Sequence, residues 1–394
     1  MAPPVPRATP VAFEFATATR IVFGAGMASE AGAAVAGIGT RALLVTGRDS
    51  SRAVAVAKAL REAGVAFRTE AVDAEPTVEW LREAVGRTRA EHCDAVVACG
   101  GGSAIDAGKA LAAMLANPGD VLNYLEVIGQ GRALPNASVP LFAIPTTAGT
   151  GAEVTRNAVL GSREHGVKAS LRSAGMLPAL AIVDPVLSLG LPPALTACTG
   201  LDALTQLIEP FVCRKANPMS DAFCREGIPR VARSLRQACE QGQDLEARSD
   251  MAMASLLSGL ALANAGLGAV HGFAAPVGGA FPAPHGAVCA ALLPHAMRAN
   301  LHALNEREPD AEALERYREV AAMLTGDAGA VAEDGLQWVE ALCRDLAIPR
   351  LGHWGVGAND VRSLTEKAAK ASSMKANAIA LTHTEMEALL LAAI

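Results

Sequence analysis

The chain has 394 residues, of which 51% are hydrophobic and 19% charged, and its formal net charge is −6. This length allows two domains, or one large one, with a substantial hydrophobic core. Because the net charge is negative, no run of basic residues occurs and aromatic residues are scarce, nucleic acid and anionic membranes are poor partners.

The ends and the cysteines indicate a cytoplasmic protein. The N-terminus, MAPPVPRATPVAF, has too much proline and too short an apolar core for a signal peptide, so we expect an unstructured lead-in. No uninterrupted apolar run approaches the roughly 20 residues that span a bilayer. The eight cysteines form no C-x-x-C pair and lie in apolar or helical contexts. Such cysteines are typical of buried thiols in a reducing cytosol rather than of a disulfide framework.

Strands and helices alternate in the N-terminal half. Residues 13–23 (FEFATATRIVF) alternate in polarity and predict a hairpin or two short strands. Continuous apolar runs then predict buried strands, and amphipathic segments predict helices between them. The predicted strands are 42–46, 65–71, 95–99, 141–145 and 180–183, and the predicted helices are 29–37, 52–63 and 77–88. This alternation indicates a parallel α/β sheet.

A glycine-rich segment follows the third of these apolar strands. Residues 95–99 run directly into Gly100-Gly101-Gly102-Ser103, and a helix comes next. Glycines let backbone N–H groups turn toward an anion, and the start of the helix adds its positive end. Ser103 and Asp106 have the spacing of a capping box, and Lys109 lies one turn further on. The segment predicts a phosphate-binding loop, with a flexible linker as the alternative.

A second loop follows the strand 141–145. It contains Thr146, Thr147 and Thr150 among small residues, at the carboxyl end of a strand where α/β proteins bind ligands. The alternative is a loop that only caps the next element. Lys168 follows in a possible strand, and Asp184-Pro185 ends the last strand of the sheet.

After Pro192-Pro193 the sequence becomes mostly helical, so we predict a domain boundary near residue 188. Asp202 and Gln206 are four residues apart and therefore share one helix face. Their neighbours are apolar, which predicts a buried helix and makes the charged Asp202 unusual.

The segment 264–294 contains two His-Gly pairs, at His271 and His285, and no Lys, Arg, Asp or Glu. Imidazoles in an apolar region need partners, because a buried polar group without one is costly. Neutral imidazole is also the commonest metal ligand. The sequence therefore favours a ligand site here, with core histidines bonded to carbonyl groups as the alternative.

The ordered set GGGSAIDAGKA, IPTTAGTGAEVT, Asp184-Pro185, GLDALTQLIEP and NAGLGAVHG…APHG…LLPH resembles the iron-containing, or group III, alcohol dehydrogenases over nearly the whole chain. The resemblance implies an N-terminal α/β nucleotide-binding domain, residues 1–187, and an all-α metal and substrate domain, residues 188–394. This is the architecture shared with dehydroquinate synthase. The active site would lie in the cleft between the domains.

The resemblance also implies an NAD(P)-dependent enzyme that interconverts an alcohol and an aldehyde or ketone with the help of Fe²⁺ or Zn²⁺. The catalytic residues would be Asp202, His271 and His285, and the same three would bind the metal with Gln206 as the fourth ligand. The nucleotide would contact Gly47, Gly100, Gly101, Gly102, Ser103, Asp106, Thr146, Thr147, Thr150 and Lys168. We further expect a homodimer or a larger homo-oligomer.

Two positions depart from the family pattern. Gln206 stands where the family has a histidine, and Ala275 stands where a histidine commonly bears on proton transfer. An amide oxygen is a weaker metal donor than imidazole, so we expect weak metal binding. The alternatives are a metal-free keto acid reductase that resembles maleylacetate reductases, a dehydroquinate-synthase-like lyase, and a nucleotide-binding protein that has lost catalysis.

The end of the second predicted strand favours NADP. An acidic residue there normally bonds the ribose 2′-hydroxyl and repels a 2′-phosphate. This chain has Gly47, followed by Arg48, which could pair with a phosphate. Asp49 counts against this interpretation.

Overall fold

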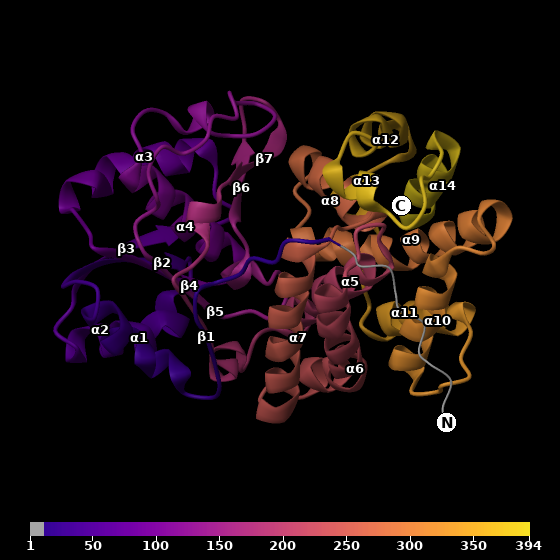
Figure 1. The fold of residues 1–394 in the computed structure, drawn as a ribbon, viewed down its shortest axis with the longest axis horizontal. Helices are drawn as coiled ribbons and strands as arrows, with labels where there is room; N and C mark the ends of the chain where they lie inside the picture. Colours follow the sequence, from indigo (N-terminus) through magenta and orange to yellow (C-terminus); the bar gives the residue numbers. More distant parts are fainter. Residues whose placement is uncertain (1–11) are drawn as a thin grey trace.

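The computed structural model describes residues 12–394, and it places an α/β half beside a helical half (Figure 1). Six parallel strands form the sheet of the α/β half in the order β1-β8-β5-β4-β2-β3. Their bounds are β1 Ile21–Phe23, β2 Arg41–Gly47, β3 Ala66–Val72, β4 Ala95–Gly100, β5 Leu141–Pro145 and β8 Leu180–Val183. The predicted strands from residue 42 onward and the parallel sheet are confirmed, and no end of these strands differs by more than one residue.

Both faces of this sheet are buried, which explains the continuous apolar runs of its strands. Along β2, Leu43 and Val45 pack on one face, while Ala42 and Leu44 pack on the other. The helices α3 (Val78–Thr88) and α4 (Gly102–Ala116) cover the first face. The helices α1 (Glu30–Ala36) and α2 (Val54–Glu62) cover the second (Figure 1).

The prediction for residues 13–23 was wrong. Only Ile21–Phe23 forms a strand, and it pairs in parallel with β8 rather than in a hairpin. Of the preceding residues, Ala16 has its partner in the helical half, where Asn264 at the end of α7 accepts from Ala16 N at 2.6 Å and donates to Ala16 O at 3.0 Å, whereas Thr19 N donates to Pro178 O in the α/β half. The first eleven residues, which carry most of the predicted lead-in, lie outside the described residues.

A separate antiparallel pair, β6 (Asn157–Ser162) and β7 (Val167–Arg172), lies outside the main sheet. The possible strand around Lys168 is β7, whereas β6 was not predicted. This hairpin packs on α8 of the helical half, where Gly279 comes close to the backbone of Val167.

From Pro193 to Ile394, all of which the structure describes, the chain is helical and contains no strand. The helix α5 (Pro193–Val212) lies inside this half and is almost wholly buried from Gly200 onward. The others are α6 Pro218–Glu240, α7 Leu245–Asn264, α8 Ala269–Ala280, α9 His285–Arg307, α10 Glu312–Thr325, α11 Ala332–Asp345, α12 Val361–Ala368, α13 Ser372–Ala376 and α14 His383–Ala393. The all-α character is confirmed, and the division at residues 187 and 188 stays a prediction.

None of the helices between residues 12 and 394 is, by itself, both long and apolar enough to cross a membrane. The helices α7 and α8 reach that threshold only as a pair, and the pair is bent by 96°.

The loop after β5 joins the two halves by a close backbone contact. Gly151 has a φ of +58°, and a Cβ built on it would lie 2.3 Å from the Cα of Gly259 on α7. Two glycines are therefore needed for the loop to pack on the helix. Gly149 N also donates to Ser255 Oγ of α7 at 2.7 Å. The threonine loop is thus fixed between the sheet and the helices.

Candidate metal and nucleotide sites

Four side chains from three helices converge in the helical half. Asp202 lies on α5, His271 in the first turn of α8, and His285 and Cys289 in the first two turns of α9. One donor atom from each lies within 4.8 Å of the others. His271 Nε2 is 3.5 Å from Asp202 Oδ1, and His285 Nε2 is 3.8 Å from the same oxygen. The structure therefore brings together three of the four predicted metal ligands.

Asp202 is a buried carboxylate with an unsatisfied oxygen. It is 1% exposed, and its Oδ1 has no hydrogen-bond partner among the described residues. Burial alone would raise its pKa, but the facing imidazoles of His285 and His271 outweigh burial and hold the pKa below its ordinary value. A buried carboxylate oxygen without a partner is costly, and a cation between it and the imidazoles would remove that cost.

Glu209 fixes the orientation of His271. It lies two turns after Asp202 on α5 and accepts hydrogen bonds from Val270 N and from His271 Nδ1, both at 2.7 Å. In the neutral form of the ring, a proton on Nδ1 is donated to Glu209, and Nε2 is then an acceptor on the side of Asp202. A metal-binding histidine is commonly held by a carboxylate in this way.

The site stabilises positive charge at the imidazoles. The Cys289 sulfur raises the pKa of His285 to about 9, against the effect of burial, and Asp202 adds to the rise. Burial opposes charge on His271, but the Cys289 sulfur and the neighbouring carboxylates hold its pKa well above the ordinary value. The His285 side chain is 34% exposed, whereas that of Asp202 is 1% exposed, so the site is reached from the side of His285.

Gln206 has a hydrogen-bond partner on α7, a helix that carries none of the four converging donors. It is 2% exposed, and its Oε1 accepts a hydrogen bond from Ser258 Oγ of α7 at 3.0 Å. Its assignment as the fourth ligand stays a prediction. The donor that sequence reasoning missed is Cys289, whose signal was its position four residues after His285. Glu209 was also missed, although it is seven residues after Asp202 and therefore on the same helix face.

The donor set fits a divalent cation. It combines two imidazoles, a carboxylate and a thiol, all common metal ligands, and one oxygen of the carboxylate lacks any other partner in the described part of the chain. The carboxylate that holds His271 completes the surroundings of such a site.

The glycine segment forms a loop at the carboxyl edge of the sheet. The helix α4 begins at Gly102, and no side chain of the described residues caps its N-terminus. A Cβ on Gly100 would lie 2.6 Å from Ala104 Cβ, and a Cβ on Gly102 would lie 2.8 Å from Thr150 Cγ2. The loop needs glycine at both places, and the free N–H groups at the helix start suit an anion.

The other predicted nucleotide residues lie around this loop. Thr146 N donates to Gly100 O at 2.9 Å, which ties the ends of β5 and β4 together. Thr147 packs beside Gly101, and the backbone N of Gly47 lies 3.3 Å from a Cβ built on Gly100. The structure therefore gathers the predicted loop residues at one edge of the sheet.

Asp106 and Lys109 turn away from the loop, so the predicted capping box was wrong. Asp106 Oδ2 accepts from Val159 N at 3.0 Å, because the turn of α4 that carries it packs on β6. Lys109 is fully buried and donates to Thr155 Oγ1 at 2.6 Å. Burial raises the pKa of Asp106 to about 6 and lowers that of Lys109 to about 8.

Lys168 lies where the hairpin meets the helical half. Its ammonium group is 2.5 Å from Glu75 Oε2, and its side chain is 10% exposed. A Cβ on Gly278 of α8 would lie 2.7 Å from Lys168 Nζ. Lys168 therefore stands at the junction of the two halves, and its contact with the nicotinamide stays a prediction.

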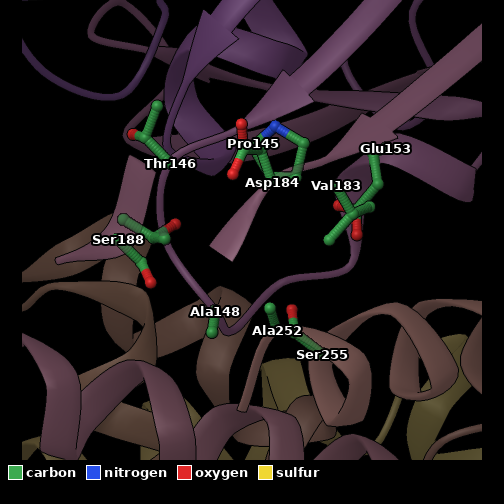
Figure 2. A pocket seen from close by; sticks show the side chains of 10 residues that line it. Pro145, Thr146, Ala148, Glu153, Val183, Asp184, Ser188, Ala252 and Ser255 are labelled. Atoms are coloured by element: carbon green, nitrogen blue, oxygen red, sulfur yellow. The ribbon is translucent and has the colours of Figure 1, made fainter. Parts of the chain in front are cut away.

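A small pocket opens between the threonine loop and α7. In Figure 2, Ala252 and Ser255 face Pro145 and Asp184 across this pocket, which has room for about one water molecule. Glu153 also lines it and is 2% exposed, and burial raises the pKa of Glu153 to about 7.

Comparison with known proteins identifies the class. The profile of the iron-containing alcohol dehydrogenases matches residues 18–185, and that of the C-terminal domain of the Fe-containing alcohol dehydrogenase family matches residues 196–394. The chain belongs to the iron-containing alcohol dehydrogenase family. It is therefore an oxidoreductase that interconverts alcohols and aldehydes, and the family uses NAD(P) and a divalent metal.

Several relatives place the chain more narrowly. It is 40% identical over 340 residues to 1,3-propanediol dehydrogenase of Klebsiella pneumoniae, covering 84% of this chain and 86% of that one. It is 34% identical to choline dehydrogenase of Bacillus subtilis, covering 90% and 89%. The crystal structure of a 1,3-propanediol oxidoreductase superposes with a TM-score of 0.90 at 35% identity, covering 98% of this chain and all of that one. The chain is thus close to the 1,3-propanediol dehydrogenases within its family.

Proposed function

We propose that this enzyme reduces a small, uncharged aldehyde or ketone with NAD(P)H, or oxidises the matching alcohol, at a divalent ion held by Asp202, His271 and His285. The observation that carries the proposal is the unsatisfied, buried Oδ1 of Asp202, which faces both imidazoles within the described part of the chain. When bound, the ion would supply a Lewis acid for the substrate oxygen.

The protein contributes orientation and a largely buried site. Glu209 holds His271 in one tautomer, and α5, α8 and α9 fix the three ligands on buried helices. The N–H groups of Gly101 and Gly102 would bind the pyrophosphate, and Thr146 and Thr147 would contact the nicotinamide side. Ala275 has no group that can carry a proton, so proton release passes through water, a ribose hydroxyl or a threonine.

The lack of charged residues in 264–294 supports an uncharged substrate. A keto acid or a dehydroquinate-like substrate is an anion, and its site would need Lys or Arg side chains that this segment does not have. For the same reason, alcohol and aldehyde chemistry is favoured over the lyase and over a maleylacetate-reductase-like reaction.

The proposed cofactor is NADP, used at least as well as NAD. Arg48 follows Gly47 at the end of β2, and its side chain is 78% exposed. Its guanidinium group donates to the carbonyl oxygen of Asp73 at 3.1 Å and lies 4.0 Å from the Asp73 carboxylate, so the cation near the expected ribose position is exposed but paired with an acid. Asp49 caps the turn after β2 by accepting from Ser51 N at 2.9 Å, and this contact lowers its pKa, so its negative charge counts against a 2′-phosphate. A cytoplasmic location and assembly into a homodimer or larger homo-oligomer also stay proposals.

The test is an assay of NADPH and NADH oxidation against a panel of aldehydes, ketones and keto acids, with metal analysis of the purified protein. We expect turnover of uncharged aldehydes that is lost in chelator and restored by Fe²⁺, Zn²⁺ or Mn²⁺. Turnover limited to keto acids, or turnover unaffected by chelator, would overturn the proposal. Asp202→Asn should abolish this turnover, whereas the control Asp250→Asn, which changes a largely buried carboxylate paired with Arg233, should leave it unchanged.

A further inference from the structure

We infer that Cys289 is the fourth protein donor to the proposed metal site, in place of Gln206, and that the site therefore prefers thiophilic ions such as Zn²⁺ and Co²⁺. This inference rests on the proposed function, because it concerns the same ion. The ligands predicted from the sequence are nitrogen and oxygen atoms only, whereas this ligand set includes a thiolate.

The distances around the site match the edges of a tetrahedron. Bonds of about 2.0 to 2.3 Å to a tetrahedral ion place neighbouring donor atoms roughly 3.3 to 3.6 Å apart. Cys289 Sγ lies 3.6 Å from His285 Nε2 and 3.9 Å from His271 Nε2. With the separations of 3.5 and 3.8 Å to Asp202 Oδ1, four edges are within a few tenths of an ångström of that geometry.

The surroundings of Cys289 differ from those of two other cysteines, the buried Cys99 and the half-buried Cys343. Its side chain is fully buried, and the hydrogen-bond contacts of its sulfur within the described residues are the two imidazole nitrogens. The sulfurs of Cys99 and Cys343 instead approach backbone carbonyl oxygens, at 4.0 and 3.8 Å. Those thiols have ordinary structural contacts, whereas Cys289 points at the same space as the unsatisfied Asp202 Oδ1.

Gln206 has a neighbour outside the donor group. Its Oε1 lies 3.0 Å from Ser258 Oγ, whose single proton is shared with the carbonyl oxygen of Ser255 at 2.8 Å. The sulfur one turn after His285, by contrast, has its contacts within the donor group.

The charge of the ligand groups and their softness decide which metal ion such a site prefers. A thiolate at Cys289 and the Asp202 carboxylate together balance a doubly charged ion, which an amide in the thiolate's place would not do. Thiolate is a soft ligand that selects Zn²⁺ over hard ions such as Mg²⁺ and Mn²⁺. A site with this donor set should therefore hold its ion more tightly than the Gln206 arrangement implies.

The test uses the full-length protein stripped of metal and loaded with Co²⁺ alone. Thiolate bound to Co²⁺ gives a near-ultraviolet charge-transfer band, whereas the visible bands of Co²⁺ report the ion whatever its ligands. We expect both signals in the wild-type protein and in Cys198→Ala, which changes a half-buried cysteine one turn before Asp202. Cys289→Ala should keep visible bands but lose the charge-transfer band, and its Zn²⁺ affinity should fall at least about 10-fold.

A double variant separates the loss of the sulfur ligand from misfolding of the Cys289→Ala protein. Cys289→Ala combined with Gln206→His should recover most of the Zn²⁺ affinity without the charge-transfer band. Visible Co²⁺ bands without a charge-transfer band in the wild-type protein would overturn the role of Cys289 and leave the proposed function standing. The charge-transfer band without aldehyde reduction would support this inference and defeat the proposed function. Failure to bind Co²⁺ at all would defeat both.

Discussion

At the residue scale, the candidate site depends on which way a few side chains point. The sequence indicated Asp202, His271 and His285, because a charge in an apolar helix and two His-Gly pairs in an uncharged segment need partners. It did not indicate Cys289 or Glu209. Their roles depend on how α5 and α9 are rotated about their axes, and neither a cysteine nor a glutamate in a helix is unusual by itself.

Glu209 gives the first prediction. Glu209→Gln keeps the shape of the side chain but weakens its hold on His271 Nδ1, so metal affinity should fall by about 10- to 100-fold. Equilibrium dialysis against Zn²⁺ measures this change. Glu70→Gln, which alters a buried glutamate paired with Arg87 in the α/β half, should leave Zn²⁺ affinity unchanged. Equal affinities for wild type and Glu209→Gln would show that the contact has no part in metal binding.

Glu153 gives a prediction about pH. Its pKa is raised from 4.5 to about 7 by burial, so the folded protein binds a proton that the unfolded chain loses between those values. The free energy of unfolding should therefore fall as the pH rises from 4.5 through 7. Glu153→Gln removes this dependence and should gain about 2 kcal/mol relative to wild type between pH 5 and pH 8. Urea unfolding at both pH values measures the difference, and a difference that does not depend on pH would contradict the prediction.

At the scale of the helices and strands, the predictions were correct where the sequence pattern of a single element is enough to identify it. The five parallel strands from residue 42 onward and the helical second half followed from local apolar patterns. The prediction for residues 13–20 was wrong because these residues bond to distant parts of the chain: Ala16 to Asn264, 248 positions away, and Thr19 to Pro178. The predicted capping box was wrong because α4 packs on β6, where Asp106 accepts a hydrogen bond from the backbone of Val159. The spacing of Ser103 and Asp106 in the sequence does not reveal this packing.

The end of β2 gives a prediction about the cofactor. Gly47 has space for a side chain, since no atom of the described residues lies within 4 Å of a Cβ built there. Gly47→Asp should place a carboxylate near the 2′-position and lower kcat/KM for NADPH by at least about tenfold relative to NADH. Steady-state kinetics with both cofactors measure the ratio. If the wild-type enzyme already prefers NADH by more than about tenfold, the interpretation of Gly47 and Arg48 is wrong.

The contact between the threonine loop and α7 gives a prediction about stability. Gly151→Ala must accommodate both a φ of +58° and the clash with Gly259, whereas Gly166→Ala at a φ of +60° meets open space. Gly166→Ala should cost about 1 kcal/mol, and Gly151→Ala roughly 2 kcal/mol more. Thermal or urea unfolding of the two variants tests this, and equal losses would mean that the glycine contact does not hold the two halves together.

At the scale of the whole molecule, the two halves hold different parts of the proposed site. The α/β half presents glycine and threonine loops at one edge of its sheet, and the helical half holds the converging Asp, His and Cys side chains. The β5 loop and the β6–β7 hairpin fix these parts relative to one another through α7 and α8. In the proposed function, this arrangement would place a nucleotide on one side and a carbonyl group on the other for hydride transfer.

The measurement that tests the central claim most directly is a titration of metal-free enzyme with Zn²⁺ or Fe²⁺ while NADPH-dependent aldehyde reduction is followed. We predict that the rate rises in proportion to bound metal and saturates near about one ion per chain, and that Asp202→Ala stays at background at every metal concentration. Full activity in chelator that Asp202→Ala leaves unchanged would contradict the account and favour a metal-free reductase.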